Sequence, residues 1–232
     1  MKRNNSYRYP KTIREMIDGR RHYEIDGKEK LPSVTTILSA TQPIEKRESL
    51  AAWRGRVGED EATRIVDRSA ARGTAMHLIL EKYILEQGYL DLTNVGKQAH
   101  NMALQVIQKG LCNITEFYGT ECTLYYPGLY AGQTDLIANH KNEMAVVDFK
   151  QSNKPKKREW IEDYCLQLAA YGMAHDFVYR TAITKGIIMM CTPDNFYQEF
   201  IIAGEEYRKY KHKWLERVNE YYESKRLPAS AG

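Results

Sequence analysis

The stretch Ala145-Val-Val-Asp148-Phe-Lys150 decides the fold, because it sets a carboxylate and a lysine into a short apolar segment typical of a β-strand. Just upstream, Gly132-Gln-Thr-Asp135-Leu-Ile has the same character. Side chains two positions apart on a strand share a face, so Asp148 and Lys150 should point the same way. If the two strands pair, Asp135 lies beside Asp148.

Helical periodicity dominates the chain before these strands and returns after them. Residues 34–40 should form a short helix capped by Ser33, and Pro43 should end that segment. The further expected helices cover Leu50 to Val57, 60–87 with a break near Gly73, 94–111, 160–179 and 207–222.

Strand patterns occupy the middle of the chain and its last third. Residues 22–31 predict a hairpin around Asp26-Gly27, a favoured two-residue turn, whereas residues 1–20 are polar and show little pattern. An antiparallel meander is expected from 115–126, 130–139 and 143–150. Two more strands are expected at 187–191 and 196–202.

This order of elements predicts an α/β (α+β) fold with a central sheet flanked by helices. We expect an N-terminal arm and hairpin over 1–30, one domain over 31–226 and a loose tail over 227–232. The composition is 43% hydrophobic and 28% charged, and no run approaches the roughly 18 apolar residues of a membrane span. The polar, basic start lacks the apolar core of a secretory signal.

The charge balance and the cysteines restrict the partners and the compartment. The formal net charge is +4, which permits a nucleic-acid partner without requiring one. The four cysteines are dispersed and no two stand at CxxC spacing, which predicts neither a disulfide framework nor a zinc site. A reducing cytoplasm is the simplest setting.

The two aspartates and the lysine suggest a metal site. Neighbouring carboxylates repel each other unless a cation lies between them, and Mg²⁺ or Mn²⁺ is the natural choice. A lysine beside that ion can orient an attacking water, as phosphodiester hydrolysis requires. The tripeptide alone is weak evidence, because Asp26-Gly-Lys28 and Glu223-Ser-Lys225 also fit it. A salt-bridged pair at a sheet edge is the competing interpretation.

Two helical segments add polar pairs. His77 and Glu81 stand one turn apart within Arg72-Gly-Thr-Ala-Met-His77-Leu-Ile-Leu-Glu81, and Gln167 and Tyr171 do so after the lysine strand. Each pair also has a structural interpretation: a packed core histidine in the first, a rim glutamine and a half-buried tyrosine in the second.

Together these motifs resemble the RecB-like branch of the PD-(D/E)XK nucleases, whose members carry an RGTxxH-type helix, a GxxD strand, a DxK strand and a QxxxY helix in this order. The segment Leu31-Pro-Ser-Val-Thr-Thr-Ile-Leu38 looks like the opening of the mitochondrial genome maintenance exonuclease group and its phage and bacterial relatives. The resemblance spans roughly Leu31 to Tyr179. It implies a restriction-endonuclease-like core with a central mixed sheet.

The resemblance also implies roles for individual residues. His77, Asp135, Asp148 and the Phe149 carbonyl would bind Mg²⁺ or Mn²⁺, and Lys150 would be the catalytic lysine. Asp135 and Asp148 would share in catalysis, while Gln167 and Tyr171 would contact DNA or support Lys150. Glu121 is a further acidic candidate, and Glu81 would be a supporting or structural residue.

Some RecB-like nucleases hold an iron–sulfur cluster with one upstream cysteine and three clustered ones, a pattern that this chain lacks, so we expect no such cluster. The basic segment that follows the lysine strand has a simpler interpretation as a solvated loop. The DNA-binding candidates are Trp53, Arg72, Lys154, Lys156, Lys157 and Arg158.

The resemblance implies a metal-dependent DNA exonuclease acting on single-stranded DNA or duplex ends. A structure-specific endonuclease is the alternative enzyme, and a DNA-binding module that keeps the fold without turnover is the alternative of a different class. DNA recombination or repair is the expected setting, with a recombination or single-strand-binding protein as the partner class and no membrane. The oligomeric state stays open, and a bacterial or virus-infected bacterial cytoplasm is the expected location.

Overall fold

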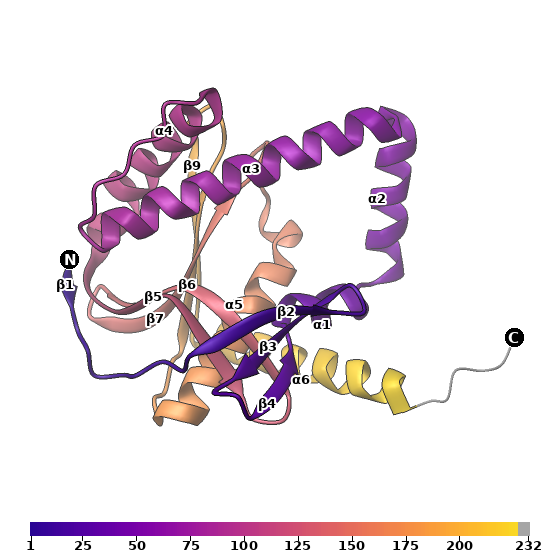
Figure 1. Ribbon diagram of the computed structural model, residues 1–232, viewed down its shortest axis with the longest axis vertical. Coiled ribbons are helices and arrows are strands. Elements are labelled where there is room, and N and C mark those ends of the chain that lie inside the picture. Colours follow the sequence, from indigo (N-terminus) through magenta and orange to yellow (C-terminus); the bar gives the residue numbers. More distant parts are fainter. Residues whose placement is uncertain (227–232) are drawn as a thin grey trace, which may run out of the picture.

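The computed structural model describes residues 1–226, and the predicted tail over 227–232 lies outside the described residues. A six-stranded sheet in the order β1-β5-β6-β7-β8-β9 forms its centre (Figure 1). β1 pairs with β5 and β7 with β8 in parallel, and the other pairs are antiparallel, so the sheet is mixed. Its strands are β1 (Lys2–Arg3), β5 (Ile114–Tyr126), β6 (Tyr130–His140), β7 (Glu143–Gln151), β8 (Lys185–Cys191) and β9 (Tyr197–Ala203).

Helices cover both faces of this sheet, which confirms the predicted α/β architecture. α3 (Glu59–Ile84) and α4 (Asn94–Lys109) pack on one face. On the other face lie α1 (Val34–Ala40), α5 (Glu162–Tyr179) and α6 (Gly204–Arg226). The remaining helical elements are α2 (Ile44–Val57) and the short 3₁₀ turns η1 (Leu111–Asn113) and η2 (Arg158–Trp160).

The period of two along the central strands distributes the core between the two faces. Val146 and Ile188 pack with α1, α5 and α6, whereas Val147 and Ile187 pack with α3 and α4. Because both faces are covered, β7 is buried from Ala145 to Phe149 and β8 is buried throughout. The expected orientation of Phe149 is confirmed, since its side chain is buried on the α3 and α4 face.

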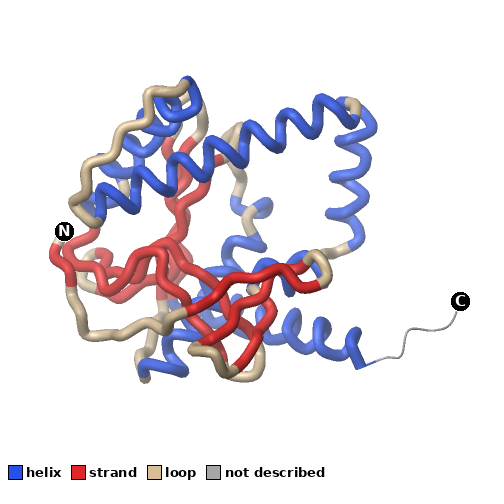
Figure 2. The backbone as a smooth tube through the Cα atoms, in the orientation of Figure 1, coloured by secondary structure: helices blue, strands red, loops and turns tan. Residues whose placement is uncertain are grey.

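A second, three-stranded sheet packs beside the central one and consists of β2 (Thr12–Ile17), β3 (Arg20–Ile25) and β4 (Glu29–Pro32) (Figure 2). The predicted hairpin turn is confirmed, with Asp26 and Gly27 at φ 48° and 70°. Ser33 continues this sheet into a bridge with Ala131 on β6. The small sheet is therefore held against the strand that carries Asp135.

Two expectations about the first third of the chain are wrong. Residues 1–20 contain β1 and β2, which the sequence did not reveal because β1 is two residues long and β2 is a largely exposed strand of mixed polarity. The expected break near Gly73 is absent, since α3 runs through it. A Cβ at Gly73 would lie 3.3 Å from Cγ of Gln151, so this glycine permits close helix–strand packing.

The division into an arm, one domain and a tail stays a prediction. The arm is joined to the domain by the pairing of β1 with β5. No helix within residues 1–226 is long and apolar enough to cross a membrane.

We predict that Gly172→Ala destabilises the protein, although alanine normally favours a helix. A Cβ at this position in α5 would lie 2.1 Å from the Tyr207 hydroxyl, which itself donates to the Leu168 carbonyl at 2.8 Å. Such overpacking costs about 1–3 kcal/mol. Urea denaturation measures the free energy of unfolding.

Gly55→Ala in α2 is the matched control, because no atom lies within 4 Å of a Cβ at that position. This control should stabilise the protein by about 0.5–1 kcal/mol. Equal stabilisation by both substitutions would contradict the described packing of α5 on α6.

Candidate active site

The site lies where two neighbouring strands separate. β6 and β7 pair from His140 with Glu143 as far as Leu136 with Val147; beyond that point β6 continues beside β5 and β7 beside β8. Asp135 is the next residue on β6 after the last pair. Its Oδ2 accepts a hydrogen bond from the backbone N–H of Phe149, so this carboxylate is fixed at the point of separation.

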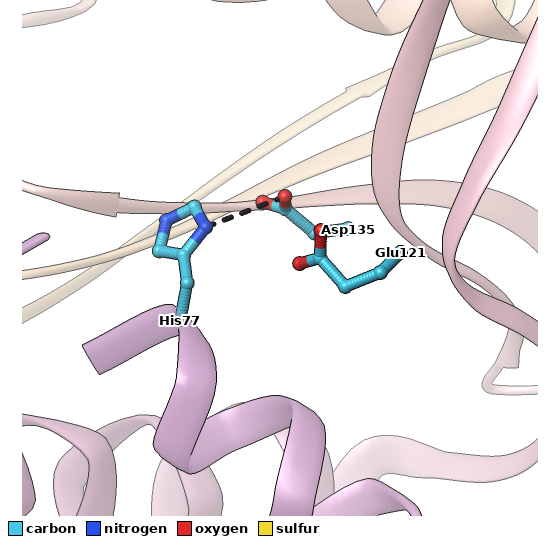
Figure 3. Close-up of side chains that lie close together, drawn as sticks. All are labelled: His77, Glu121 and Asp135. Atoms are coloured by element: carbon cyan, nitrogen blue, oxygen red, sulfur yellow. Dashed lines mark ion pairs between the residues drawn. The ribbon is translucent and has the colours of Figure 1, made fainter. Parts of the chain in front are cut away.

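His77 reaches this point from α3. Its Nε2 lies 2.8 Å from the Phe149 carbonyl oxygen, and its Nδ1 lies 3.4 Å from Oδ1 of Asp135 (Figure 3). Burial lowers the pKa of His77, but the Asp135 carboxylate outweighs that effect and raises the pKa to about 9. In the absence of a cation, the imidazole therefore carries the charge that balances Asp135.

Glu121 on β5 completes a group that could hold a metal ion. One ligand atom each from His77, Glu121 and Asp135 lies within 4.8 Å of the others, and Figure 3 shows the Glu121 carboxylate beside Asp135. Gln133 Nε2 donates to Glu121 Oε2 at 2.9 Å and to its backbone carbonyl at 3.0 Å. Burial, and secondly the Asp135 charge, raises the pKa of Glu121 to about 7.

The backbone of Glu121 is unusual for a strand residue. Its φ is 48°, in the left-handed region, which costs a non-glycine residue about 1–3 kcal/mol and is concentrated at functional sites. The two hydrogen bonds from Gln133 hold the residue in this conformation. This suggests that the fold tolerates backbone strain at Glu121 because it brings a third possible metal ligand to the group.

The donor set suits a hard divalent cation. The two carboxylates match the oxygen preference of Mg²⁺ and Mn²⁺, and the imidazole adds one nitrogen ligand. His77 and Asp135 were expected among the ligands. Glu121 was expected only as a further acidic candidate, but the structure places it in the same group as these two residues. The Phe149 carbonyl borders the group, since it already contacts His77, while the Asp148 carboxylate is engaged with Lys150. The ligand roles of His77, Glu121, Asp135, Asp148 and Phe149 all stay predictions.

Lys150 follows Asp148 by two residues on β7, and the two side chains form an ion pair in which Asp148 is buried and Lys150 is half-buried. Burial works against the charge of Lys150, yet the Asp148 carboxylate prevails and raises the lysine pKa. Burial raises the pKa of Asp148 to about 6, although the lysine opposes this. At neutral pH the site therefore holds a cationic lysine beside the candidate metal group.

Tyr164 on α5 is a supporting residue that the sequence did not reveal. The Lys150 ammonium lies 5.1 Å from the centroid of its ring, a cation–π contact. Tyr164 precedes Gln167 by three residues and so lies on the same side of the helix, which was the available signal. Tyr164 thus supports Lys150, and the roles expected of Gln167 and Tyr171, contact with DNA or support of Lys150, stay predictions.

Tyr171 and the glycine of the GxxD strand are in close contact. A Cβ at Gly132 would lie 2.6 Å from Cε1 of Tyr171, so the glycine makes room for the buried ring. Gln167 is half-buried, and its Oε1 has no hydrogen-bond partner within residues 1–226. Glu81 is half-buried and lines a cavity with His77 and Glu121, so it borders the candidate metal group.

The DNA-binding candidates divide into two groups. Trp53, Arg72, Lys154 and Lys156 line a cavity of about 750 Å³ between α2, α3 and the loop after β7, with Tyr164 at its wall. Lys157 and Arg158 are not among the lining residues. Arg158 instead forms an ion pair with Glu206, and the Lys157 ammonium lies 5.4 Å from the Trp160 ring centroid.

Arg72 is placed differently from what a surface contact to DNA would need. Only 5% of its surface is exposed, and its guanidinium donates to Gln151 at 3.0 Å, to Gln98 at 3.2 Å and to Asn153. It therefore ties α3 and α4 to the end of β7. Its contact with DNA stays a prediction.

We predict that the affinity for Mn²⁺ rises from pH 6 to pH 8 and beyond, because Glu121, with its pKa of about 7, and His77, with its pKa of about 9, must each lose a proton to bind the ion. Glu121→Gln should weaken binding by at least about tenfold at pH 8, the lower end of what loss of a supporting ligand partner costs. The loss should be smaller at pH 6, where the carboxyl group is largely protonated. Calorimetric titration at both pH values measures this.

Glu45→Gln, which removes an exposed carboxylate on α2, is the charge-matched control and should bind Mn²⁺ as the parent does. A Glu121→Gln protein whose Mn²⁺ affinity equals that of this control at pH 8 would remove Glu121 from the candidate metal group.

Comparisons with known proteins agree with the motifs. No family model matches the chain. The mouse mitochondrial genome maintenance exonuclease 1 is 30% identical over 207 residues, covering 84% of this chain and 60% of the relative. The human protein of the same name is 29% identical over 210 residues, covering 84% and 59%. The alkaline exonuclease of Laribacter hongkongensis overlays with a TM-score of 0.32 at 12% identity, covering 65% of this chain and 81% of that one.

The chain thus spans about three fifths of the length of the curated relatives that it matches. The matched part is most of this chain. The resemblance to the mitochondrial genome maintenance exonuclease group, which the segment Leu31–Leu38 predicted, is confirmed by these matches: the chain is similar in sequence to these exonucleases over most of its length.

Proposed function

We propose that this protein is a metal-dependent DNA exonuclease that hydrolyses phosphodiester bonds in single-stranded DNA or at DNA ends. The observation that carries the proposal is the group of His77, Glu121 and Asp135 beside the ion pair of Asp148 and Lys150. The names of the sequence relatives support the exonuclease activity. The single-strand preference rests on the family resemblance.

The residues of the site would have separate roles in the reaction. A bound Mg²⁺ or Mn²⁺ would activate a water for attack on phosphorus and stabilise the leaving oxygen. His77, Glu121 and Asp135 would hold that ion between three elements of the fold. Lys150 presents a positive charge where negative charge develops on the phosphate, and Asp148 and Tyr164 keep its ammonium in place.

The surroundings of the site fit a nucleic-acid strand. The cavity lined by Trp53, Lys154 and Lys156 adjoins Tyr164 and so lies next to Lys150. Lysines bind backbone phosphates, and the tryptophan offers a ring on which an unpaired base can stack. A recombination or single-strand-binding protein as partner, and a role in recombination or repair, belong to the same proposal. The proposed location is the cytoplasm of a bacterial or virus-infected bacterial cell.

The test is a cleavage assay on end-labelled single-stranded, double-stranded and circular DNA with Mg²⁺, Mn²⁺ or EDTA. Lys150→Ala should lower the cleavage rate by about 100-fold or more, because it removes a charge that acts on the transition state. Its Mn²⁺ titration should show that the ion still binds. Lys97→Ala, at an exposed position of α4, is the control and should cleave as the parent does.

The substrates separate the competing functions. Loss of linear strands with circles spared supports the exonuclease, and the order of the products gives its direction. Cut circles would indicate a structure-specific endonuclease that uses the same residues. Tight DNA binding without cleavage by the parent protein would indicate a binding module, and full activity of Lys150→Ala would exclude this lysine from the mechanism.

A further inference from the structure

Two arginines of the small sheet face the candidate metal group. Arg14 on β2 stands directly opposite Tyr23 on β3, and Arg21 precedes Tyr23 by two residues on the same strand. The strand period therefore puts all three side chains on one face of the small sheet. Tyr23 is buried in a cluster that includes Ala131 of β6, so this face is the one turned toward the central sheet.

The guanidinium groups of both arginines are available to bind an anionic ligand. Arg14 and Arg21 are exposed, and within residues 1–226 neither side chain forms an ion pair with a carboxylate. Together they line a cavity of about 490 Å³ with His77, Glu81 and Glu121. Two positive charges without a carboxylate partner thus border the same space as two of the candidate metal-binding residues.

The backbone of Arg21 is held in place even though its side chain is exposed. Its carbonyl oxygen accepts hydrogen bonds from the Ser33 backbone N–H at 2.9 Å and from the Thr36 hydroxyl at 2.8 Å. Ser33 in turn caps α1 by accepting from the Thr36 backbone N–H at 2.9 Å. The segment Leu31–Leu38, which the candidate site does not otherwise use, therefore fixes the position of Arg21.

β2 is fastened to the central sheet in the same region. The Thr12 hydroxyl lies 2.9 Å from that of Thr123 on β5, close to Glu121 in the chain. Arg14 follows Thr12 by two residues and so lies on the same face of β2. Both arginines therefore start from fixed backbone positions, which limits the entropy lost when they bind a ligand.

The electrostatics of the site call for such charges. Asp135 and Asp148 are paired with His77 and Lys150, but within residues 1–226 Glu81 and Glu121 form no ion pair, so these two carboxylates add negative charge where a phosphodiester must approach, and like charges repel. Lys154 and Lys156 line a cavity with Arg72 and Ser69 of α3, whereas Arg14 and Arg21 line one with His77 and Glu81, farther along that helix. Positive charge is thus available on both sides of the candidate metal group.

We infer that Arg14 and Arg21 form a phosphate-binding site that holds the DNA backbone next to the metal group, on the side away from Lys154 and Lys156. This inference rests on the proposed function and goes beyond it by assigning part of the substrate path to the small sheet. Arginine forks match phosphate oxygens bidentately, which favours backbone contacts over base reading.

The test compares the double variant Arg14→Gln/Arg21→Gln with Arg20→Gln. Arg20 is an exposed neighbour on β3, and its side chain faces the opposite side of the strand. It lines neither the cavity that contains Glu121 and Asp135 nor the cavity that contains His77. The affinity for a fluorescent single-stranded oligonucleotide is measured by anisotropy at several salt concentrations, with Ca²⁺ replacing Mn²⁺ to slow cleavage. Steady-state cleavage, Mn²⁺ titration and thermal unfolding complete the set.

The double variant should bind DNA more weakly. The negative slope of log affinity against log salt concentration should become shallower by about 1.4, which is about 0.7 for each of two phosphates that the protein no longer neutralises. KM should rise while kcat and the Mn²⁺ affinity stay unchanged, and Arg20→Gln should match the parent throughout. An unchanged salt slope, beside a parent protein that cleaves DNA, would overturn the inference and leave the proposed function standing.

Two other outcomes would also overturn the inference. A changed Mn²⁺ affinity with an unchanged salt slope would show that the arginines balance the site carboxylates instead of binding DNA. A parent protein that neither binds nor cleaves DNA would remove the proposed function and, with it, this phosphate site.

Discussion

Where β6 and β7 separate beyond the pair of Leu136 with Val147, the backbone N–H of Phe149 takes the carboxylate of Asp135 as its acceptor. That hydrogen bond fixes the carboxylate at the point where the sheet opens. The carbonyl of the same phenylalanine receives His77 from α3, which brings a helix on one face to the strands that form the site. The separation of two strands thus creates both the space and the anchor for the candidate metal group.

Buried charge defines the rest of the site. Charges that leave water are costly unless they are paired, and the fold pairs His77 with Asp135 and Lys150 with Asp148. Glu121 has no cationic partner within residues 1–226, and burial raises its pKa. A divalent ion would supply the missing charge, which connects the strained backbone of Glu121 with the proposed chemistry.

Local patterns in the sequence predicted the sheet, the helices on its faces and the burial of Phe149, because these depend on periods of two and 3.6 residues. The close approach of α3 to β7 at Gly73 was misread as a helix break, since only the neighbouring strand explains that glycine. The burial of Arg72 and the placement of Glu121 depend on partners far along the chain. Arg21 lies on β3, one residue before the predicted hairpin, and its position depends on hydrogen bonds from Ser33 and Thr36, which no local pattern reveals.

His77, Glu121 and Asp135 are proposed to hold one divalent ion, and the rest of the proposed chemistry depends on that ion. A crystal structure of the protein grown with Mn²⁺, measured at a wavelength where manganese scatters anomalously, tests this proposal directly. We expect an anomalous peak about 2.0–2.2 Å from a nitrogen of His77 and from carboxylate oxygens of Asp135 and Glu121. A Mn²⁺ peak elsewhere in the molecule, with none between these three residues, would contradict it.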